Sequence, residues 1–479
     1  MEQPLTVLHS VFGYTAFRPG QAEIIEALLA EKDVLAILPT GAGKSLCFQV
    51  PGLCKAGTCF VISPLISLMQ DQVQTLKRKG VAAEYLSSTQ SEQEREDVLH
   101  KLASGQLQFI YVAPERLLTP AFLLACKQST CSQLIIDEAH CISIWGNQFR
   151  PEYRNIGAFR AALQTSVPTA AFTATATPEV VTDICSALQL QHATVIKQSF
   201  ARPNLSIYVY PCESHTAREI AILRLVKKYD GKSGIVYAAT RSSVTEITTV
   251  IQTYLPKITV SSYHAGMTAI DRKEIQNNFL SGKTSLIVAT TAFGMGIDKS
   301  DVRYVLHYQL PASIENYYQE IGRAGRDGEP SDCYLLTVPQ DAHIQLELIK
   351  KSGNPEQQLV TVQKLKHLAN YVQSKECYHQ DILQYFGEKS TACATQCSNC
   401  CKNTPNHELL YGLSNPTEIA RLQTLLMWRA SKAERMYLPE RAILTDKQLC
   451  KLAFDPQDFH SSTTRFTHQL PELQPDSID

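Results

Sequence analysis

Two short polar stretches reveal the architecture of this chain: Thr40-Gly41-Ala42-Gly43-Lys44-Ser45 and Asp137-Glu138-Ala139-His140. Each follows an apolar run, residues 34–38 in the first case and residues 134–136 in the second. Short apolar runs of this kind predict buried strands of a parallel sheet. Both polar stretches then lie at the carboxyl ends of strands, where open α/β sheets bind their ligands. The sequence therefore predicts an α/β fold with a ligand site at this edge.

The first stretch has the composition of a phosphate-binding loop. Its glycines let backbone N–H groups approach phosphate oxygens, Lys44 adds a positive charge, and the Ser45 hydroxyl can bind Mg²⁺. The strict form of this loop has glycine where the chain has Leu38, so an ordinary glycine turn opening a helix is the alternative interpretation. The predicted nucleotide-binding residues here are Thr40, Gly41, Ala42, Gly43, Lys44 and Ser45.

The second stretch supplies two neighbouring carboxylates. Asp137 is placed to hold Mg²⁺ together with Ser45, and Glu138 is placed to orient and polarise an attacking water. Lys44, Asp137 and Glu138 are accordingly predicted to be catalytic. The two stretches together favour a triphosphatase that uses ATP and Mg²⁺.

Size and composition are those of a globular protein. The chain has 479 residues, enough for about three domains. Lys and Arg number 45 against 46 Asp and Glu, so no global basic field indicates nucleic acid, although a local basic groove would suffice. We find no long apolar run and no leader pattern, and expect neither secretion nor membrane insertion. Most of the scattered cysteines are expected to be reduced and buried.

Alternating strand-like and helical patterns predict two sheet domains. The strand-like runs of the first are residues 34–38, 59–62, 109–112, 134–136 and 169–172, and those of the second are residues 234–237, 260–263, 285–289, 302–307 and 333–336. Residues 200–204 read as an extended connector because they contain Pro203. We expect domains at 1–204 and 205–339, a helical zinc-binding subdomain at 340–403, with helices at 343–352 and 356–375, and a short tail at 404–479. The tail is expected to hold helices at 416–433 and 446–453 and to end in disorder.

The second domain contributes its own polar motifs near the ends of late strands. Residues 290–298 include Gly296 and Asp298, which we predict to contact nucleotide, and residues 319–328 carry Arg323 and Arg326. An arginine delivered to a γ-phosphate can accelerate hydrolysis by ~10³ to 10⁵. A surface helix with solubilising arginines is the alternative, and the flanking glycines disfavour it.

Over roughly residues 5–402 these motifs resemble those of the RecQ family of DNA helicases. The resemblance implies two RecA-like motor domains in tandem and an adenine-recognition element at Phe12-Gly13-Tyr14 and Phe17-Arg18-Pro19-Gly20-Gln21. In that element it implies stacking by Tyr14 and amide contacts from Gln21, with Arg18 beside them. Further motor motifs are matched by residues 62–65, 172–176 and 263–267.

The stretch from Cys141 to Tyr153 is similar to the family's aromatic-rich loop, which links DNA contact to ATP hydrolysis. Trp145 and Phe149 are predicted to stack on unpaired bases, and Arg150 to meet a phosphate or a base face. The alternative is that Trp145 is a core residue. Asn147 and Gln148 stand where the family has a His-Asp pair, so we expect ATP hydrolysis that is less tightly gated by DNA.

Four cysteines follow the pattern C-x15-C-x3-C-x2-C: Cys377, Cys393, Cys397 and Cys400. Four thiolates at such spacing predict a tetrahedral structural Zn²⁺ site, with Cys401 as a possible substitute ligand. Free buried cysteines are the alternative. The spacing also resembles the RecQ zinc module, although Tyr378-His379 replaces a usual basic pair, which argues against a DNA contact by this helix.

The resemblance implies an ATP-dependent 3′→5′ DNA helicase that acts in repair and recombination on single-stranded and partially duplex DNA. We expect a monomer in a bacterial-type cytoplasm, associated with the nucleoid. The tail lacks the strand pattern of a winged helix and resembles part of a helical HRDC domain, with Trp428 in its core. Two alternatives are kept: an RNA-directed remodeler of the same superfamily, and a DNA-binding or annealing protein with a weakly coupled ATPase.

Overall fold

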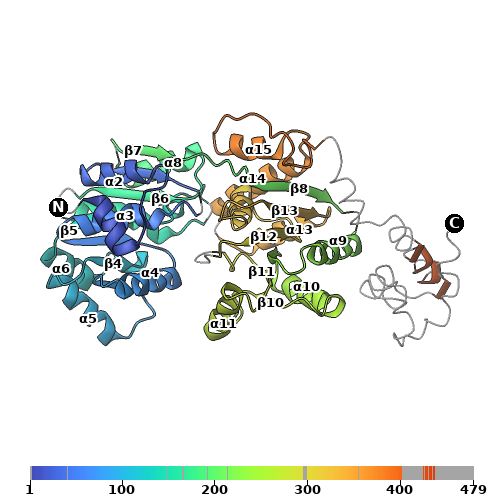
Figure 1. The fold of residues 1–479 in the computed structure, drawn as a ribbon, viewed down its shortest axis with the longest axis horizontal. Helices are drawn as coiled ribbons and strands as arrows, with labels where there is room; N and C mark the ends of the chain where they lie inside the picture. The colour runs from blue at the N-terminus through green and yellow to red at the C-terminus, as the bar shows by residue number, and fades with distance from the viewer. Residues whose placement is uncertain are drawn as a thin grey trace. The chain divides into compact units, whose positions relative to one another are not determined.

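The computed structural model describes residues 3–39, 41–146, 148–163, 167–190, 192–212, 214–294, 299–353 and 355–401, with runs of two or three residues between 424 and 436. The chain divides into two compact units. The first comprises Met1–Ala201 with Pro355–Val360 and Ile382–Ser390, and the second comprises Arg202–Asn354, Thr361–Asp381 and Thr391–Asp479. Figure 1 colours the chain from blue at its N-terminus to red at its C-terminus.

The first unit is built on a seven-stranded parallel sheet with the order β3-β4-β2-β5-β6-β1-β7. Its strands are β1 (Val34–Ile37), β2 (Thr58–Ile62), β3 (Ala83–Leu86), β4 (Phe109–Val112), β5 (Cys131–Ile136), β6 (Thr169–Thr173) and β7 (Thr194–Lys197). The five predicted strands are confirmed, and β3 and β7 at the two edges are additional. All residues of β1, β2, β4 and β6 are buried, as expected for parallel strands covered on both faces.

Helices connect these strands in the βαβ manner that the alternating pattern predicts. The α-helices are α1 (Pro4–Val7), α2 (Gln21–Leu29), α3 (Lys44–Cys54), α4 (Ile66–Arg78), α5 (Glu92–Ala103), α6 (Pro120–Gln128), α7 (Asn155–Ala162) and α8 (Pro178–Ala187). Short helical turns are η1 (Leu8–Phe12), η2 (Pro114–Arg116), η3 (Ala139–Ile142) and η4 (Pro151–Arg154). The strand order places the carboxyl ends of β1 and β5 on either side of β6, so the loops that follow them share one edge of the sheet.

The second unit contains a six-stranded parallel sheet with the order β10-β11-β9-β12-β13-β8. Its strands are β8 (Leu205–Pro211), β9 (Ser233–Tyr237), β10 (Val260–Tyr263), β11 (Leu286–Ala289), β12 (Val302–His307) and β13 (Ser331–Thr337). The five predicted strands are again confirmed, and the edge strand β8 is additional. The helices are α9 (His215–Lys228), α10 (Arg241–Tyr254), α11 (Ala269–Leu280), α12 (Ile314–Ile321) and α13 (Asp341–Lys350).

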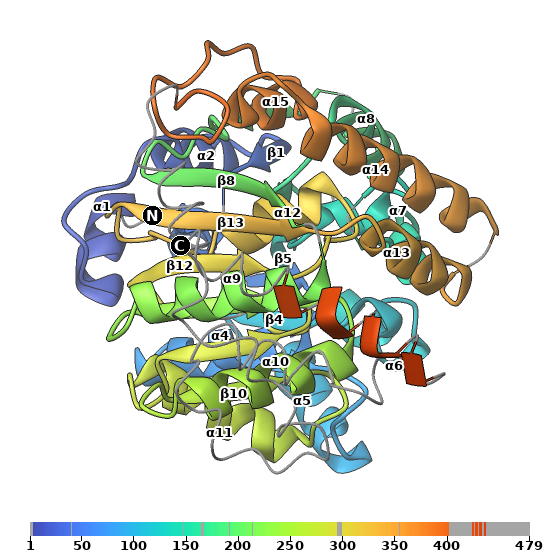
Figure 2. The same ribbon diagram turned by 90° about the vertical axis from the view of Figure 1, so that its right-hand side faces the viewer.

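Helices and a cysteine-bearing loop follow this sheet in sequence. They are α14 (Pro355–Gln373), close to its predicted bounds, and α15 (Tyr378–Tyr385). The cysteine loop pairs with the start of β8, because Ile207 N–H donates to the Gln396 carbonyl at 2.9 Å and Ser398 N–H donates to the Ile207 carbonyl at 3.0 Å. Figure 2 shows this region in orange beside β8.

Most of the tail lies outside the described residues, including the predicted helix at 446–453 and the predicted disordered end. The described positions between 424 and 436 are helical, which agrees with the prediction for that stretch, and Trp428 is half-buried. None of the helices in the described ranges is long and apolar enough to span a bilayer.

Candidate functional site

The phosphate-binding loop leaves the buried strand β1 and runs directly into α3. Gly41 and Gly43 adopt φ values of 86° and 77°, a left-handed conformation that favours glycine. A Cβ at Gly43 would also lie 2.5 Å from the Gln21 side-chain nitrogen. Because α3 begins at Lys44, its N–H groups and the positive end of its dipole face the space after the strand, as an anion site requires. Thr40 lies outside the described residues.

Arg18, just before α2, and Gln21, the first residue of α2, hold this loop. The Gln21 amide nitrogen donates to the carbonyls of Ala42 (2.9 Å) and Gly43 (3.2 Å), and its oxygen accepts the Arg18 N–H (2.9 Å). The Arg18 guanidinium donates to the Gly41 carbonyl at 2.6 Å. Gln21 is buried, so an adenine contact by its amide would have to replace one of these bonds. Tyr14 is 53% exposed, as a stacking residue would be.

The carboxylates follow β5 on the same edge of the sheet. The Asp137 carboxylate accepts hydrogen bonds from the Ser63 hydroxyl (3.4 Å) and from the Glu138 N–H (3.0 Å). Burial, and then the neighbouring charge of Glu138, raise the pKa of Asp137 to about 6. A bound Mg²⁺ would reverse that shift, because a divalent cation favours the ionised carboxylate. The hydroxyl of Ser45 and the carboxylate of Asp137 are the hard oxygen donors that Mg²⁺ prefers.

Glu138 lies between two basic side chains. Its carboxylate is 4.0 Å from the Lys44 ammonium and 3.3 Å from His140 Nδ1. Its φ of 48° is left-handed, a strained conformation for a residue other than glycine that is typical of functional sites. The structure thus brings together the predicted catalytic residues Lys44, Asp137 and Glu138.

His140 connects this site to the end of β6. Its Nδ1 lies 3.0 Å from the Thr173 hydroxyl, which in turn donates to the Thr175 carbonyl at 3.0 Å. His140 and both threonines are buried. Through His140, the carboxylate motif is therefore linked directly to the Thr173-Ala174-Thr175 stretch.

The aromatic-rich loop starts immediately after His140. The Ser143 hydroxyl accepts the Trp145 N–H (3.1 Å) and donates to the Asp183 carboxylate (2.5 Å) in α8. A Cβ on Gly146 would lie 1.8 Å from the His140 carbonyl oxygen, so only glycine allows the loop this close approach.

Trp145 is 37% exposed and is therefore not a core residue. Phe149 and Arg150 are half-buried, and the Arg154 guanidinium lies 5.2 Å from the centre of the Phe149 ring. The three predicted DNA-binding side chains thus sit on a loop fixed to the carboxylate motif, with an aromatic ring presented to solvent. Gln148 is also half-buried, and Asn147 lies outside the described residues.

In the second unit, the two predicted arginines follow the C-terminal end of α12. Arg323 is buried and Arg326 is half-buried. Burial raises the pKa of Tyr237, and the positive charges of Arg323 and Arg326 act against that rise. The Tyr237 hydroxyl donates to the Phe293 carbonyl at 2.7 Å. The arginines therefore lie near the segment that leads into residues 295–298. Gly296 and Asp298 themselves are outside the described residues.

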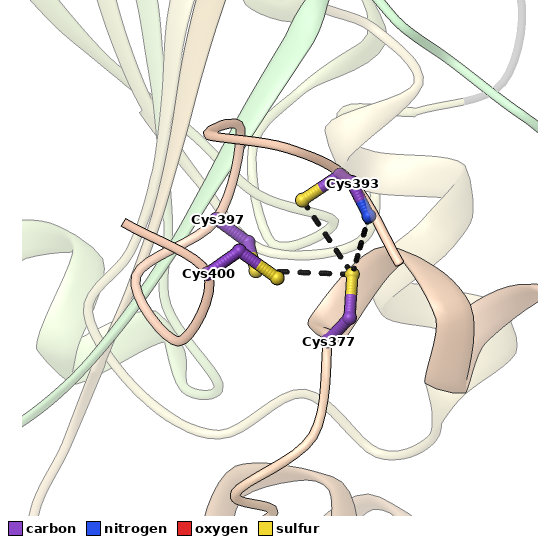
Figure 3. A group of neighbouring side chains, drawn as sticks. All are labelled: Cys377, Cys393, Cys397 and Cys400. Carbon is purple, nitrogen blue, oxygen red and sulfur yellow. Dashed lines mark hydrogen bonds between the residues drawn. The ribbon is translucent and has the colours of Figure 1, made fainter. Parts of the chain in front are cut away.

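The four predicted zinc ligands form a compact group (Figure 3), with all sulfurs within 4.8 Å of one another. Cys377 Sγ is 3.5 Å from Cys393 Sγ and 4.0 Å from Cys397 Sγ. A tetrahedral site with Zn–S bonds of about 2.3 Å places sulfurs about 3.8 Å apart, so this set fits Zn²⁺. Cys401 is not part of the group.

Hydrogen bonds lower the pKa of one of these thiols. Burial raises the pKa of Cys377, but the N–H groups of Cys393 and Gln380, with neighbouring thiols, outweigh it and lower the pKa overall. His379, in place of a usual basic residue, is turned inward: its Nε2 lies 3.1 Å from the Gln396 carbonyl oxygen, and burial lowers its pKa.

The sequence patterns did not predict several contacts of the site. Ser143 and Asp183 are 40 positions apart, and nothing local to either predicts their bond. The Tyr153 hydroxyl donates to the backbone carbonyl of Asp137 at 3.0 Å, which ties the end of the aromatic loop to the carboxylate motif. Only the spacing of known motifs could have indicated such pairs.

Three family models match the chain. They describe a DEAD/DEAH box helicase (residues 18–184), a helicase conserved C-terminal domain (residues 217–328) and RecQ zinc-binding (residues 339–401). The last of these covers all four clustered cysteines.

Similar proteins carry related names. The ATP-dependent DNA helicase RecQ of Bacillus subtilis is 42% identical over 405 residues, which cover 84% of this chain and 68% of the relative. The protein of the same name from Haemophilus influenzae is 42% identical over 410 residues, covering 85% of this chain and 65% of that one. The chain thus spans about two thirds of the length of these relatives.

The fold is shared with solved structures of lower sequence identity. The DEAD-box helicase Mss116 bound to ssRNA and UDP-BeF superimposes with a TM-score of 0.62 at 16% identity, covering 95% of this chain and 90% of the other. At this identity the likeness concerns the fold alone: two RecA-like parallel-sheet domains.

Proposed function

This chain belongs to the RecQ family of ATP-dependent DNA helicases, and we propose that it couples ATP hydrolysis to 3′→5′ translocation along DNA and to DNA unwinding. Its cofactors are ATP, Mg²⁺ and Zn²⁺, and DNA is its partner. The observation that carries the proposal is the continuity of contacts from Lys44 through Glu138 and His140 to the loop that presents Trp145.

We assign the chemistry to residues of both units. Gly41, Ala42, Gly43 and the N-terminus of α3 cradle the phosphates, and Lys44 neutralises their charge. Ser45 and Asp137 hold Mg²⁺, and Glu138 orients the attacking water. Arg326, assisted by Arg323, stabilises the charge that develops in the transition state. Thr40, Gly296 and Asp298 remain proposed nucleotide contacts, as do Tyr14, Arg18 and Gln21.

DNA contact is assigned to Trp145, Phe149 and Arg150. Two hydrogen bonds support coupling between DNA contact and ATP hydrolysis. Ser143 N–H donates to the His140 carbonyl (3.2 Å), and the Ser143 hydroxyl accepts from Trp145 N–H. A base stacked on Trp145 would fix a loop whose other end is attached to the residues that act on ATP. Binding of DNA would in this way favour the hydrolytic geometry.

We further propose that the protein acts as a monomer in repair and recombination, in the bacterial cytoplasm and in association with the nucleoid. The bacterial source of the two relatives supports this setting. The boundaries 1–204, 205–339, 340–403 and 404–479 are proposed as its functional domains.

The experiment is steady-state ATP hydrolysis by the wild type and Lys44→Ala, with and without single-stranded DNA and with single-stranded RNA of equal length. We expect stimulation by DNA that exceeds stimulation by RNA and is abolished in the variant. Equal stimulation by RNA would favour an RNA-directed remodeler. A rate of ATP hydrolysis that neither DNA nor RNA changes, with strand annealing intact in Lys44→Ala, would favour an annealing protein.

A further inference from the structure

The turn that carries the two arginines is held by the first residues of the second unit. The first unit's main segment ends at Ala201, and the next residue, Arg202, donates through its guanidinium to three carbonyls of this turn. The acceptors are Ala324 (2.9 Å), Gly325 (3.1 Å) and, more weakly, Gly322 (3.4 Å). The segment that the sequence predicted only as an extended connector thus contacts the turn that carries Arg323 and Arg326.

Asn204 completes the contact from the same segment. Its side-chain amide donates to the carbonyls of Gly325 (2.8 Å) and Glu329 (3.1 Å), and its backbone carbonyl accepts the Ser331 N–H (2.9 Å). Gly325 has a left-handed φ of 55°, and a Cβ there would lie 2.4 Å from the Asn204 amide nitrogen. Glycine at this position lets the amide approach the turn.

These bonds go to carbonyls of the turn that follows α12. The helix ends at Ile321, and of the three acceptors Gly325 also receives the Gly328 N–H, at 3.1 Å. A guanidinium is suited to this place because its fixed fork serves several acceptors, and its charge is favourable at the negative end of a helix dipole. The backbone from Gly322 to Gly325 sets the direction of the Arg323 side chain and the start of the path to Arg326. Arg202 and Asn204 hold it in addition to its own backbone bonds, among them the bond from Gly325 N–H to the Val302 carbonyl at 2.9 Å.

We propose that Arg202 and Asn204 are positioning residues for ATP hydrolysis, which act by fixing the turn that aims Arg323 and Arg326 at the γ-phosphate. This inference rests on the proposed function of those two arginines. It assigns to the connector a part in positioning the catalytic arginines, beyond joining the two units.

The first test is the ATPase activity of Arg202→Gln, measured with saturating single-stranded DNA. A catalytic group displaced by about 1 Å can lose ~10²-fold in rate, so we expect kcat to fall by about that factor while KM for ATP stays nearly unchanged. Affinity for MgADP with aluminium fluoride, which mimics the transition state, should fall in parallel, and affinity for MgADP alone should not. Arg202→Lys, which keeps the charge but loses the fork, should lie between the wild type and Arg202→Gln.

Arg160→Gln is the matched control. Arg160 also donates to carbonyls at a helix end, those of Leu188 (2.6 Å) and Gln189 (3.3 Å), but it belongs to the first unit, whereas the arginine turn belongs to the second. This variant should keep the wild-type kcat. Asn204→Ala, a milder change in the same segment as Arg202, should lower kcat less than Arg202→Gln and provides a second variant if Arg202→Gln folds poorly.

Non-additivity distinguishes a positioning role from a separate contribution. On an Arg323→Ala/Arg326→Ala background, Arg202→Gln should have no further effect on kcat, because it acts through the arginines. An equal loss on both backgrounds, a wild-type kcat in Arg202→Gln, or a loss of kcat matched by the loss of folded protein would each overturn the inference. If Arg326→Ala itself retains full activity, the proposed function of the arginines has failed instead.

Discussion

Trp145 presents an exposed aromatic ring on a loop whose backbone is held in place by neighbouring residues. Ser143 holds its N–H, and Gly146 lies against the His140 carbonyl, yet the indole is 37% exposed. Exposure of a large apolar ring has an unfavourable solvation free energy unless a partner covers it, and an unpaired base is such a partner. Gly146 is as necessary as the tryptophan, because any side chain there would push the loop away from His140.

We predict that Trp145→Ala weakens binding of single-stranded DNA and removes most of the stimulation of ATP hydrolysis, while the DNA-free rate persists. Loss of one stacked base removes ~1–3 kcal/mol, or about 5- to 150-fold in affinity. Fluorescence anisotropy of a labelled oligonucleotide and ATPase titrations with DNA measure both effects. Leu124→Ala, which truncates an exposed apolar residue of α6, should leave both unchanged. Unaltered DNA stimulation in Trp145→Ala would remove the loop from the proposed DNA contact.

The strands that the sequence did not predict are all at sheet edges. The residues of β7 are mostly exposed or half-buried, and β3 is buried only at its two ends. An edge strand that is covered on fewer sides can carry polar residues, so a search for continuous apolar runs does not detect it. Strand β8 begins with alternating burial, which a search for fully buried strands overlooks. The central strands were predictable because burial on both faces demands apolar residues throughout.

One buried ion pair holds α13 against α9 and was not predictable from either helix alone. The Arg218 guanidinium donates to both carboxylate oxygens of Asp341, at 2.7 and 2.8 Å, and lies 4.0 Å from the centre of the Tyr308 ring. Both charged side chains are almost completely buried. Removing one partner leaves the other charge desolvated without compensation.

Asp341→Asn is therefore expected to destabilise the second unit by about 3–5 kcal/mol. Urea unfolding monitored by circular dichroism measures the shift in midpoint. The exposed pair between Lys350 and Glu347 is the comparison, and Glu347→Gln should leave the midpoint unchanged. The double variant Arg218→Met/Asp341→Leu should recover much of the loss, since it removes both charges. A midpoint for Asp341→Asn equal to that of the wild type would show that the pair does not stabilise this unit.

We expect the cysteine loop to depend on bound Zn²⁺ for its order, as small metal-binding modules generally do. Apart from its pairing with β8, the loop has little regular hydrogen bonding, so four metal bonds would supply much of its order. We predict one Zn²⁺ per chain, lost in Cys397→Ser and retained in Cys401→Ser, as measured by mass spectrometry of the purified protein for metal. Cys401 is the matched control because it neighbours a ligand in sequence but lies outside the sulfur group. Loss of zinc in both variants would contradict the four-sulfur assignment.

Across the whole chain, sequence reasoning recovered what depends on local patterns. The two parallel sheets, the phosphate loop, the carboxylate pair and the cysteine group each follow from residues close together in the sequence or at fixed spacing. The contacts that link them do not: His140 with Thr173, Ser143 with Asp183, and Arg202 with the arginine turn. These pairs join elements that meet only when the sheets have formed, and a single sequence carries no local trace of them.

The coupling between DNA and ATP is the property in which we expect this chain to depart from its family. Asn147 and Gln148 stand where a His-Asp pair is usual, and neither amide carries charge or titrates near neutral pH. Among the described residues, one link from Trp145 toward the carboxylates runs through hydrogen bonds between neutral groups, those of Ser143 and the His140 carbonyl. A neutral hydrogen bond is weaker than one that involves a charged group, so the path should transmit less free energy than an ionised pair.

We therefore predict that Asn147→His/Gln148→Asp raises the ratio of DNA-stimulated to DNA-free ATP hydrolysis, chiefly by lowering the DNA-free rate. The ratio is measured for the wild type and the variant with saturating single-stranded DNA and with none. Gln148→Glu alone is the control, because it adds a negative charge without the histidine and should not reproduce the full effect. Strong stimulation of the wild type that the double variant leaves unchanged would show that coupling in this chain runs through Ser143 and His140 and needs no charged pair.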